Sequence, residues 1–264
     1  MKHVQTLHNE QCTDHVYPDN FVIGKVTDEN CVSANRQEKK FLLIKHSDGW
    51  HNDRCARWLQ QNGYPAFTHI SREGEALPDV KEFSHVLIYG GAPCVNDATH
   101  QYHLRSELDL IEAALHNDVA CMGICLGAQM IAHVLGADVK PLPCGTSEFG
   151  FSLITPTEDG SDFMQQPFNM LQWHCEGFDL PADCTLLATG NLFPNQAFRY
   201  GSKTFGIQFH PEVTAEVLQC WHRQHLTGTS ESECLRKQQL TDCARHANTI
   251  DNWCNQFMRK WVSA

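Results

Sequence analysis

The sequence predicts an α/β fold with an open, mostly parallel central sheet flanked by helices. Two observations lead to this prediction. Short apolar runs of strand type alternate with helical patterns, and the spacing between successive strands suits parallel crossovers with helices on both faces. At 264 residues, 42% of them hydrophobic, the chain is long enough for one substantial domain and too short for two of full size.

The alternation begins with an apolar strand at Phe41–Lys45. A helix is predicted over Asn52–Gln61, because Asn62-Gly63 is a typical helix stop. Two more strands are predicted at Pro65–Ile70 and Ser84–Tyr89, and the second of them ends at a Gly-Gly pair. These elements open the sheet.

The next helix is predicted from apolar residues at spacings of four, three and four, which share one helical face. They are Leu104, Leu108, Ile111 and Leu115. A strand at Val119–Gly123 follows, and an apolar stripe then predicts another helix, through Ala128, Ile131, Ala132 and Leu135. This strand–turn–helix unit contains the most informative motif of the chain.

Beyond Glu148 the pattern changes to short strands separated by turn residues. The candidates are Phe149–Ile154, Asn169–Trp173, Cys184–Ala188, Gln196–Tyr200 and Thr204–Phe209. Two helices are predicted to close the chain. The last carries an amphipathic stripe made of Ile250, Trp253, Cys254, Phe257, Met258 and Trp261.

Composition excludes several classes of function. A formal net charge of -11, without a basic run, argues against nucleic-acid binding, because no cationic surplus can neutralise phosphates. No stretch predicts a membrane span or a secretory signal. Thirteen cysteines, an odd number spread singly, do not form a disulfide framework. We therefore expect a cytoplasmic protein without membrane or nucleic-acid partners.

Gly123-Ile-Cys125-Leu-Gly127 has the form G-x-C-x-G between an apolar strand and an apolar-striped helix. This is the cysteine version of a nucleophile elbow, a sharp turn that exposes the nucleophile at the end of the sheet. Small neighbours are needed there, and the following helix dipole favours the thiolate. The alternative is that Cys125 is one buried cysteine among thirteen.

A thiolate nucleophile needs a histidine that stores a proton and returns it to the leaving amine. Among sixteen histidines, His210 is the candidate, because an apolar strand is predicted to end at Phe209, just before it. Glu212, two residues further on, is close enough to accept a hydrogen bond from the imidazole and fix its tautomer. Taken alone, His-Pro-Glu would be an ordinary surface turn.

These residues give the chain a resemblance to the class I, triad-type glutamine amidotransferases, and in particular to the stand-alone group related to the glutaminase domain of GMP synthase. The resemblance implies their flavodoxin-like fold over residues 41–264, with residues 1–40 as an N-terminal extension of unknown role. Four motifs carry it in order, namely residues 90–97, 123–129, 172–181 with 194–198, and 206–213.

The resemblance implies a role for each matched position. Cys125 would attack the γ-carbonyl of glutamine, His210 would act as base and then acid, and Glu212 would orient it. The backbone N–H groups of Gly91 and Leu126 would hold the oxyanion. The substrate-binding residues would be Gly90, Gln129, His174 and Glu176. No cofactor and no metal is implied.

Three functions remain open at this point. The first is hydrolysis of glutamine to glutamate and ammonia, with a separate synthase chain as the possible acceptor of the ammonia. The second is a stand-alone γ-glutamyl hydrolase acting on a larger amide or peptide. It is favoured by Cys175 and Glu176, which stand where relatives usually have Gly and Asp. The third is a non-catalytic binding protein that keeps the fold, although all three triad positions are filled.

Two groups of cysteines and histidines are candidates for metal ligands. Cys220, His222 and His225 match no common zinc spacing, and they are expected to be surface histidines of a helix beside buried cysteines. The same expectation holds for His3, His8, Cys12 and His15 in the N-terminal extension.

Overall fold

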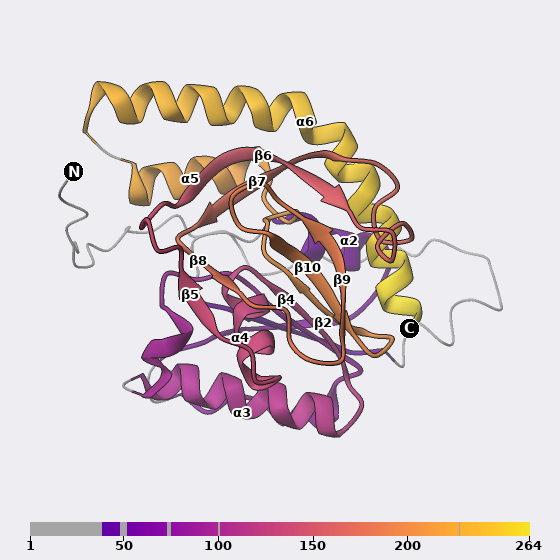
Figure 1. Cartoon of the computed structure of the whole chain (residues 1–264). Helices are drawn as coiled ribbons and strands as arrows, with labels where there is room; N and C mark the ends of the chain where they lie inside the picture. Colours follow the sequence, from indigo (N-terminus) through magenta and orange to yellow (C-terminus); the bar gives the residue numbers. More distant parts are fainter. Residues whose placement is uncertain (1–38, 48–51, 73–74, 100, 227) are drawn as a thin grey trace, which may run out of the picture.

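The computed structural model describes residues 39–47, 52–72, 75–99, 101–226 and 228–264. It confirms the predicted α/β class, with a nine-stranded sheet covered by helices on both faces (Figure 1). Apart from Lys39 and Lys40, the predicted N-terminal extension of residues 1–40 lies outside the described residues, together with its three histidines and Cys12.

The main sheet has the strand order β2-β1-β3-β4-β11-β10-β9-β6-β7. The first five strands in this order are parallel, and the last four extend the sheet in antiparallel fashion. The strands are β1 (Phe41–Lys45), β2 (Ala66–Ile70), β3 (His85–Ile88), β4 (Ala120–Ile124), β6 (Glu148–Pro156), β7 (Phe168–His174), β9 (Cys184–Thr189), β10 (Asn195–Tyr200) and β11 (Thr204–Ile207). Two short strands that the sequence pattern did not indicate, β5 (Val139–Pro141) and β8 (Glu176–Phe178), pair with each other.

The helices lie close to the predicted positions. They are α2 (Arg54–Gln61), α3 (Tyr102–His116), α4 (Leu126–Val134), α5 (Ala215–His225) and α6 (Ser230–Ser263), with 3₁₀ turns η1 (Val80–Glu82) and η2 (Val95–Thr99). Helix α2 begins two residues later than predicted, because Asp53 is its N-cap and accepts a hydrogen bond from the Ala56 N–H. Within the described ranges, every helix is too short or too polar to cross a lipid bilayer.

Alternate residues of the parallel strands face two separate hydrophobic cores. Leu42 and Ile44 of β1 pack in the core under α3 and α4, whereas Phe41 and Leu43 pack in the core under α2, α5 and α6. Strands buried on both faces in this way read as continuous apolar runs, which is why the sequence shows them clearly. Figure 1 shows α3 and α4 on one side of the sheet and α6 on the other.

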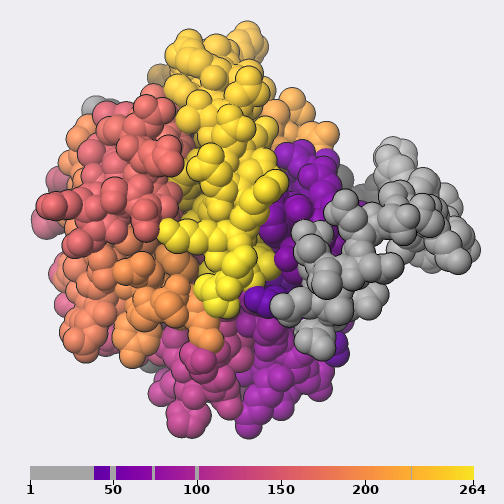
Figure 2. All heavy atoms as spheres, turned by 90° about the vertical axis from the view of Figure 1, so that its right-hand side faces the viewer, coloured from indigo at the N-terminus to yellow at the C-terminus, as the bar shows by residue number. Residues whose placement is uncertain are grey.

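Helix α6 joins the two halves of the sheet. It contacts α2, beside the parallel strands, and β6 and β7 at the antiparallel edge. Figure 2 shows it in yellow, running between the strands of residues 150–200 on one side and α2 on the other. The predicted stripe lies on its buried face, and Trp261 is fully buried.

The end of β11 differs from the sequence prediction, which carried this strand to Phe209. The strand ends at Ile207, opposite Ile124, the last residue of its parallel partner β4, and the chain turns from β10 to β7 over the next three residues. The Gln208 N–H donates to the Gln196 carbonyl, and the His210 N–H donates to the Leu171 carbonyl of β7 at 2.9 Å. His210 therefore lies beyond the strand end and is held by the antiparallel half of the sheet.

Candidate active site

The candidate site lies where the carboxyl ends of four neighbouring parallel strands meet. His46 follows β1, Gly90 and Gly91 follow β3, Cys125 follows β4, and His210 lies beyond β11. The carboxyl edge of such a sheet is the usual location of ligand sites in open α/β folds. The fold therefore brings together groups that are far apart in the sequence.

Cys125 has the geometry expected of a nucleophile elbow. It joins β4 to α4 with φ 51° and ψ -107°, a conformation that is strained for a residue with a side chain. A Cβ added at Gly123 would lie 2.3 Å from the Gly127 carbonyl, and one at Gly127 would lie 2.2 Å from the Ile88 carbonyl. Both glycines are therefore required by close backbone approach. Leu126 is the first residue of α4, so its N–H is among those with no partner within the helix.

His210 and Glu212 form a buried pair. The Nδ1 of His210 donates to Oε1 of Glu212 at 2.9 Å, and both side chains are almost inaccessible to solvent. Burial by itself lowers the pKa of His210, but the Glu212 carboxylate and the Cys125 sulfur outweigh it and raise this pKa to about 10. The ring also meets Trp221 edge to face, with 4.9 Å between the ring centroids.

Arg54, at the start of α2, holds the segment that carries Glu212. Its backbone N–H donates to the Glu212 carbonyl at 2.8 Å, and its guanidinium donates to the carbonyls of Pro211 and Val213. The same side chain pairs with Asp251 of α6. These contacts fix the backbone on both sides of the carboxylate, so the position of Glu212 depends on two helices.

Gly90 lies against both His210 and Cys125. A methyl group at Gly90 would be 2.9 Å from Cε1 of His210 and 3.3 Å from Cβ of Cys125. The Cys125 sulfur also contacts the Trp173 carbonyl at 3.9 Å. The structure therefore brings the three predicted triad residues and the predicted glycine loop into one place.

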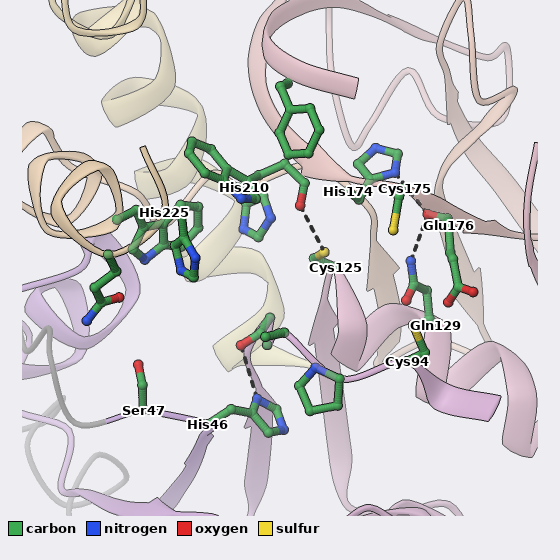
Figure 3. A pocket seen from close by; sticks show the side chains of 18 residues that line it. His46, Ser47, Cys94, Cys125, Gln129, His174, Cys175, Glu176, His210 and His225 are labelled. Atoms are coloured by element: carbon green, nitrogen blue, oxygen red, sulfur yellow. Dashed lines mark hydrogen bonds between the residues drawn. The ribbon is translucent and has the colours of Figure 1, made fainter. Parts of the chain in front are cut away.

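The remaining predicted residues lie on the other side of Cys125 (Figure 3). Gln129 donates from Nε2 to the Glu176 carbonyl at 2.9 Å, and Nδ1 of His174 donates to the same oxygen at 2.9 Å. His174 is buried, and its other ring nitrogen contacts Gln172 at 3.0 Å. The two side chains together fix the backbone that presents Glu176 to the cavity.

Most of the predicted site residues line one cavity of about 380 Å³. The exceptions are Glu212 and Leu126. Among the described lining residues none is Lys or Arg, and Glu176 is the single carboxylate. A ligand in this cavity thus meets one fixed negative charge, the Cys125 sulfur and several aromatic rings.

Sequence reasoning missed a buried ion pair below the glycine loop. His46 donates from Nδ1 to the Gly90 carbonyl at 3.0 Å and from Nε2 to Oε2 of Glu107 at 2.9 Å. Burial lowers the pKa of His46, but the Glu107 charge and the hydrogen bonds outweigh it and raise this pKa above its ordinary value. Since both ring nitrogens face acceptors, each carries a proton, and the ring is an imidazolium opposite the Glu107 carboxylate. The 61-residue separation explains why no local pattern indicated it.

Four aromatic side chains of the cavity were also missed as functional residues. They are Phe149, Trp173, Trp221 and His225, from β6, β7 and α5. His222 and His225 were both predicted to be surface histidines of a helix, and this prediction is wrong for His222. His222 is buried and bonded to Gln239 at 2.7 Å, whereas His225 is exposed at the cavity rim. Across the described ranges no group of three or more His, Cys, Asp or Glu side chains could hold a metal ion.

Comparison with known proteins gives the family of the chain. The family model of glutamine amidotransferase class-I matches residues 57–220, a range that contains Cys125 and His210. The chain is 31% identical over 172 residues to the glutamine amidotransferase-like protein YfeJ of Salmonella typhimurium, covering 62% of this chain and 71% of that protein. It is 29% identical over 177 residues to one subunit of the glutamine-hydrolysing GMP synthase of Methanobrevibacter smithii, covering 65% of this chain and 86% of that subunit.

Solved structures agree with the sequence comparisons. A glutamine amidotransferase from Thermotoga maritima superposes with a TM-score of 0.79 at 26% identity, covering 86% of this chain and all of that one. A glutamine amidotransferase from Methylobacillus flagellatus shares the fold, with a TM-score of 0.76 at 20% identity over 86% and 95%. The family match spans more than half of the chain and agrees with the motifs predicted from the sequence, so the chain belongs to the class I glutamine amidotransferases.

Proposed function

We propose that residues 41–264 form a cysteine hydrolase that cleaves the side-chain amide of glutamine and releases glutamate and ammonia. Cys125 is the nucleophile, His210 the acid–base catalyst, and Glu212 the residue that orients His210. The observation that carries the proposal is the strained elbow of Cys125, which meets the buried His210–Glu212 pair across Gly90.

In the first step, the Cys125 thiolate attacks the γ-carbonyl carbon of glutamine. The negative charge that develops on oxygen is held by the N–H groups of Gly91 and Leu126. The C–N bond then breaks, and His210 gives its proton to the leaving nitrogen, so that ammonia departs and a γ-glutamyl thioester remains. Nδ1 of His210 is bonded to Glu212, which leaves Nε2 as the nitrogen that transfers the proton.

In the second step, a water molecule attacks the thioester. His210, now neutral, takes a proton from the water, the C–S bond breaks, and glutamate leaves with the second oxygen. The imidazolium and the thiolate are then restored together. The raised pKa of His210 fits this role, because the resting site stores the proton on the ring next to the sulfur.

The glutamate half of the substrate is assigned to the side of Cys125 that carries Gln129, His174 and Glu176. The Glu176 carboxylate would pair with the α-ammonium group of glutamine, and it suits this task because it is the single carboxylate of the described lining. Gly90 lies between the triad residues and borders the same space. The hydrogen bonds of Gln129 and His174 to the Glu176 backbone would hold that carboxylate in place.

Two functions differ in whether the released ammonia is passed to a partner chain. The Methanobrevibacter smithii relative belongs to a glutamine-hydrolysing GMP synthase made of more than one chain, which supports delivery of ammonia to a separate synthase chain. The second candidate, a stand-alone γ-glutamyl hydrolase, needs no such chain. It is favoured by the cavity, whose aromatic side is much larger than ammonia requires. Eleven described cysteines are free thiols, which supports a cytoplasmic location as part of the proposal.

The assignment of Cys125 is tested by glutamate release from glutamine. The variant Cys125→Ala should lose activity and keep its unfolding temperature, whereas Cys94→Ala and Cys175→Ala, at two other cysteines of the same cavity, should stay active. An electrophilic glutamine analogue should modify Cys125 alone in the unaltered chain. Substantial turnover by Cys125→Ala, or equal modification of Cys94 and Cys175, would refute the assignment.

A further inference from the structure

We propose that the cavity contains a second subsite, which binds a bulky apolar amine as the leaving group of a γ-glutamyl amide. The subsite is the aromatic wall formed by Phe149, Trp173, Trp221 and His225. The inference rests on the proposed function, because it concerns the amine half of the same substrate. It makes the γ-glutamyl amide of such an amine a better substrate of Cys125 than glutamine.

The aromatic wall is a continuous series of ring contacts. Phe149 meets Trp173 at 5.5 Å with an interplanar angle of 89°, and Trp173 meets Trp221 at 5.5 Å and 69°. Trp221 in turn meets His210 at 4.9 Å and 83°. These edge-to-face pairs keep the rings in fixed relative positions. The wall thus runs from the cavity rim to the proposed acid–base catalyst.

The chemistry of the first step decides which half of the substrate meets this wall. The nitrogen of the scissile amide must lie beside His210, because His210 protonates it as it leaves. The substituent on that nitrogen therefore extends along the side of the cavity next to His210. Figure 3 shows His210 and His225 on one side of Cys125, with Gln129 and Glu176 on the other. The glutamate half is thus assigned to the polar side and the amine to the aromatic wall.

The composition of the wall indicates the class of amine. Among the described residues of the cavity, Lys and Arg do not occur, and the imidazolium of His210 is needed for proton transfer, so a second carboxylate on the amine would find no cation dedicated to it. Flat aromatic surfaces bind aryl or branched alkyl groups through burial and ring contacts. Ammonia is too small to cover these aromatic surfaces, which would stay in contact with water. A γ-glutamyl amide of an arylalkyl or branched alkyl amine is the substrate class that covers them.

Phe149 is the part of the wall that can be tested most cleanly. Its side chain is 53% exposed, although it belongs to a strand and touches Trp173. Single exposed apolar residues are common on protein surfaces. Phe67 of β2 is such a residue, with the same 53% exposure and no place in the cavity, so it provides a matched control.

The experiment compares glutamate release from glutamine and from γ-glutamyl benzylamide by the purified chain. Ammonia and benzylamine are bases of similar strength, so the two leaving groups differ mainly in size and apolar surface. We expect a kcat/KM at least about tenfold higher for the benzylamide. Phe149→Ala should lower that value about three- to tenfold and reduce the ratio of the two kcat/KM values by at least about twofold. Phe67→Ala should change neither.

Each other result overturns the inference. Equal use of the two substrates would refute the subsite even if glutamine is cleaved quickly, and it would leave the proposed function intact. Equal losses on both substrates in Phe149→Ala would show that Phe149 only supports the fold around Cys125. Failure to release glutamate from any γ-glutamyl compound would refute the inference and the proposed function together.

Discussion

Replacing His46 by leucine tests the buried ion pair below the glycine loop. Glu107 is completely buried, its Oε2 is bonded to His46, and its Oε1 has no hydrogen-bond partner in the described part of the structure. The substitution leaves this carboxylate buried and unpaired. Breaking a buried ion pair in this way costs about 3–5 kcal/mol of unfolding free energy. For a chain of this size the unfolding temperature should fall by about 6–20 °C.

A second substitution separates stability from activity. In the double variant His46→Leu/Glu107→Leu no buried charge remains unpaired, so most of the lost stability should return. In the double variant the Gly90 carbonyl still lacks the hydrogen bond from His46. The His46 ring also packs directly on the glycine loop, since a methyl group added at Gly91 would lie 2.7 Å from Cγ of His46. Removing one oxyanion donor costs about 10²–10³ in kcat, so a displaced Gly91 N–H should cost at least about tenfold.

Thermal unfolding and glutamate release, measured on both variants, check this reasoning. The single variant should be unstable and slow, and the double variant should be nearly as stable as the original chain but still slow. If the single variant unfolds at the original temperature, the charge of His46 does not stabilise the buried Glu107 carboxylate. If the double variant recovers full turnover, His46 does not position the loop for catalysis.

Two further predictions concern Gly90 and His210. Gly90→Ala should lower kcat about 10²-fold with little loss of stability. The new Cβ would lie 2.9 Å from the His210 ring, whereas ordinary carbon contacts are about 3.5–4.0 Å. Turnover within about threefold of the original would contradict this steric account. The pKa of His210 is about 10 in the folded chain, against an ordinary value of about 6.5. The charged ring therefore stabilises the folded state fully below about pH 6.5, and this stabilisation is lost as the pH rises through about 10. The unfolding temperature should therefore fall between pH 7 and about 10 more steeply in the original chain than in His210→Asn, and parallel curves would refute the charge assignment.

The sequence was sufficient for the fold class and for the places of Cys125, His210 and Glu212. Parallel strands buried on both faces produce apolar runs, and the elbow needs Gly123 and Gly127 for reasons that are local to five residues. Such short-range requirements can be read directly from a single sequence. The resemblance added the expectation that the separate motifs meet at one edge of the sheet, and the structure brings them together there.

The rest depended on contacts between distant segments. His46 follows β1 and Glu107 lies in α3, and nothing in either segment of the sequence marks them as partners. His225 was expected only as a helical histidine and Trp221 was not singled out, and it is the packing of α5 at the cavity that brings both residues to the site. The end of β11 was misplaced for a similar reason, since the hydrogen bond from His210 to Leu171 comes from another strand.

The position of Trp261 has a consequence for how the chain is made. Its ring meets those of Phe41 and His85, at 5.9 Å and 5.0 Å between centroids, and the Lys39 ammonium donates to the neighbouring Val262 carbonyl at 2.6 Å. The first strand of the described residues, β1, is therefore covered by the C-terminal turns of α6, and Lys39 and Val262 are 223 residues apart in the sequence. Contacts of such high sequence separation slow folding, and during synthesis the uncovered face of β1 and β3 offers apolar surface to other nascent chains.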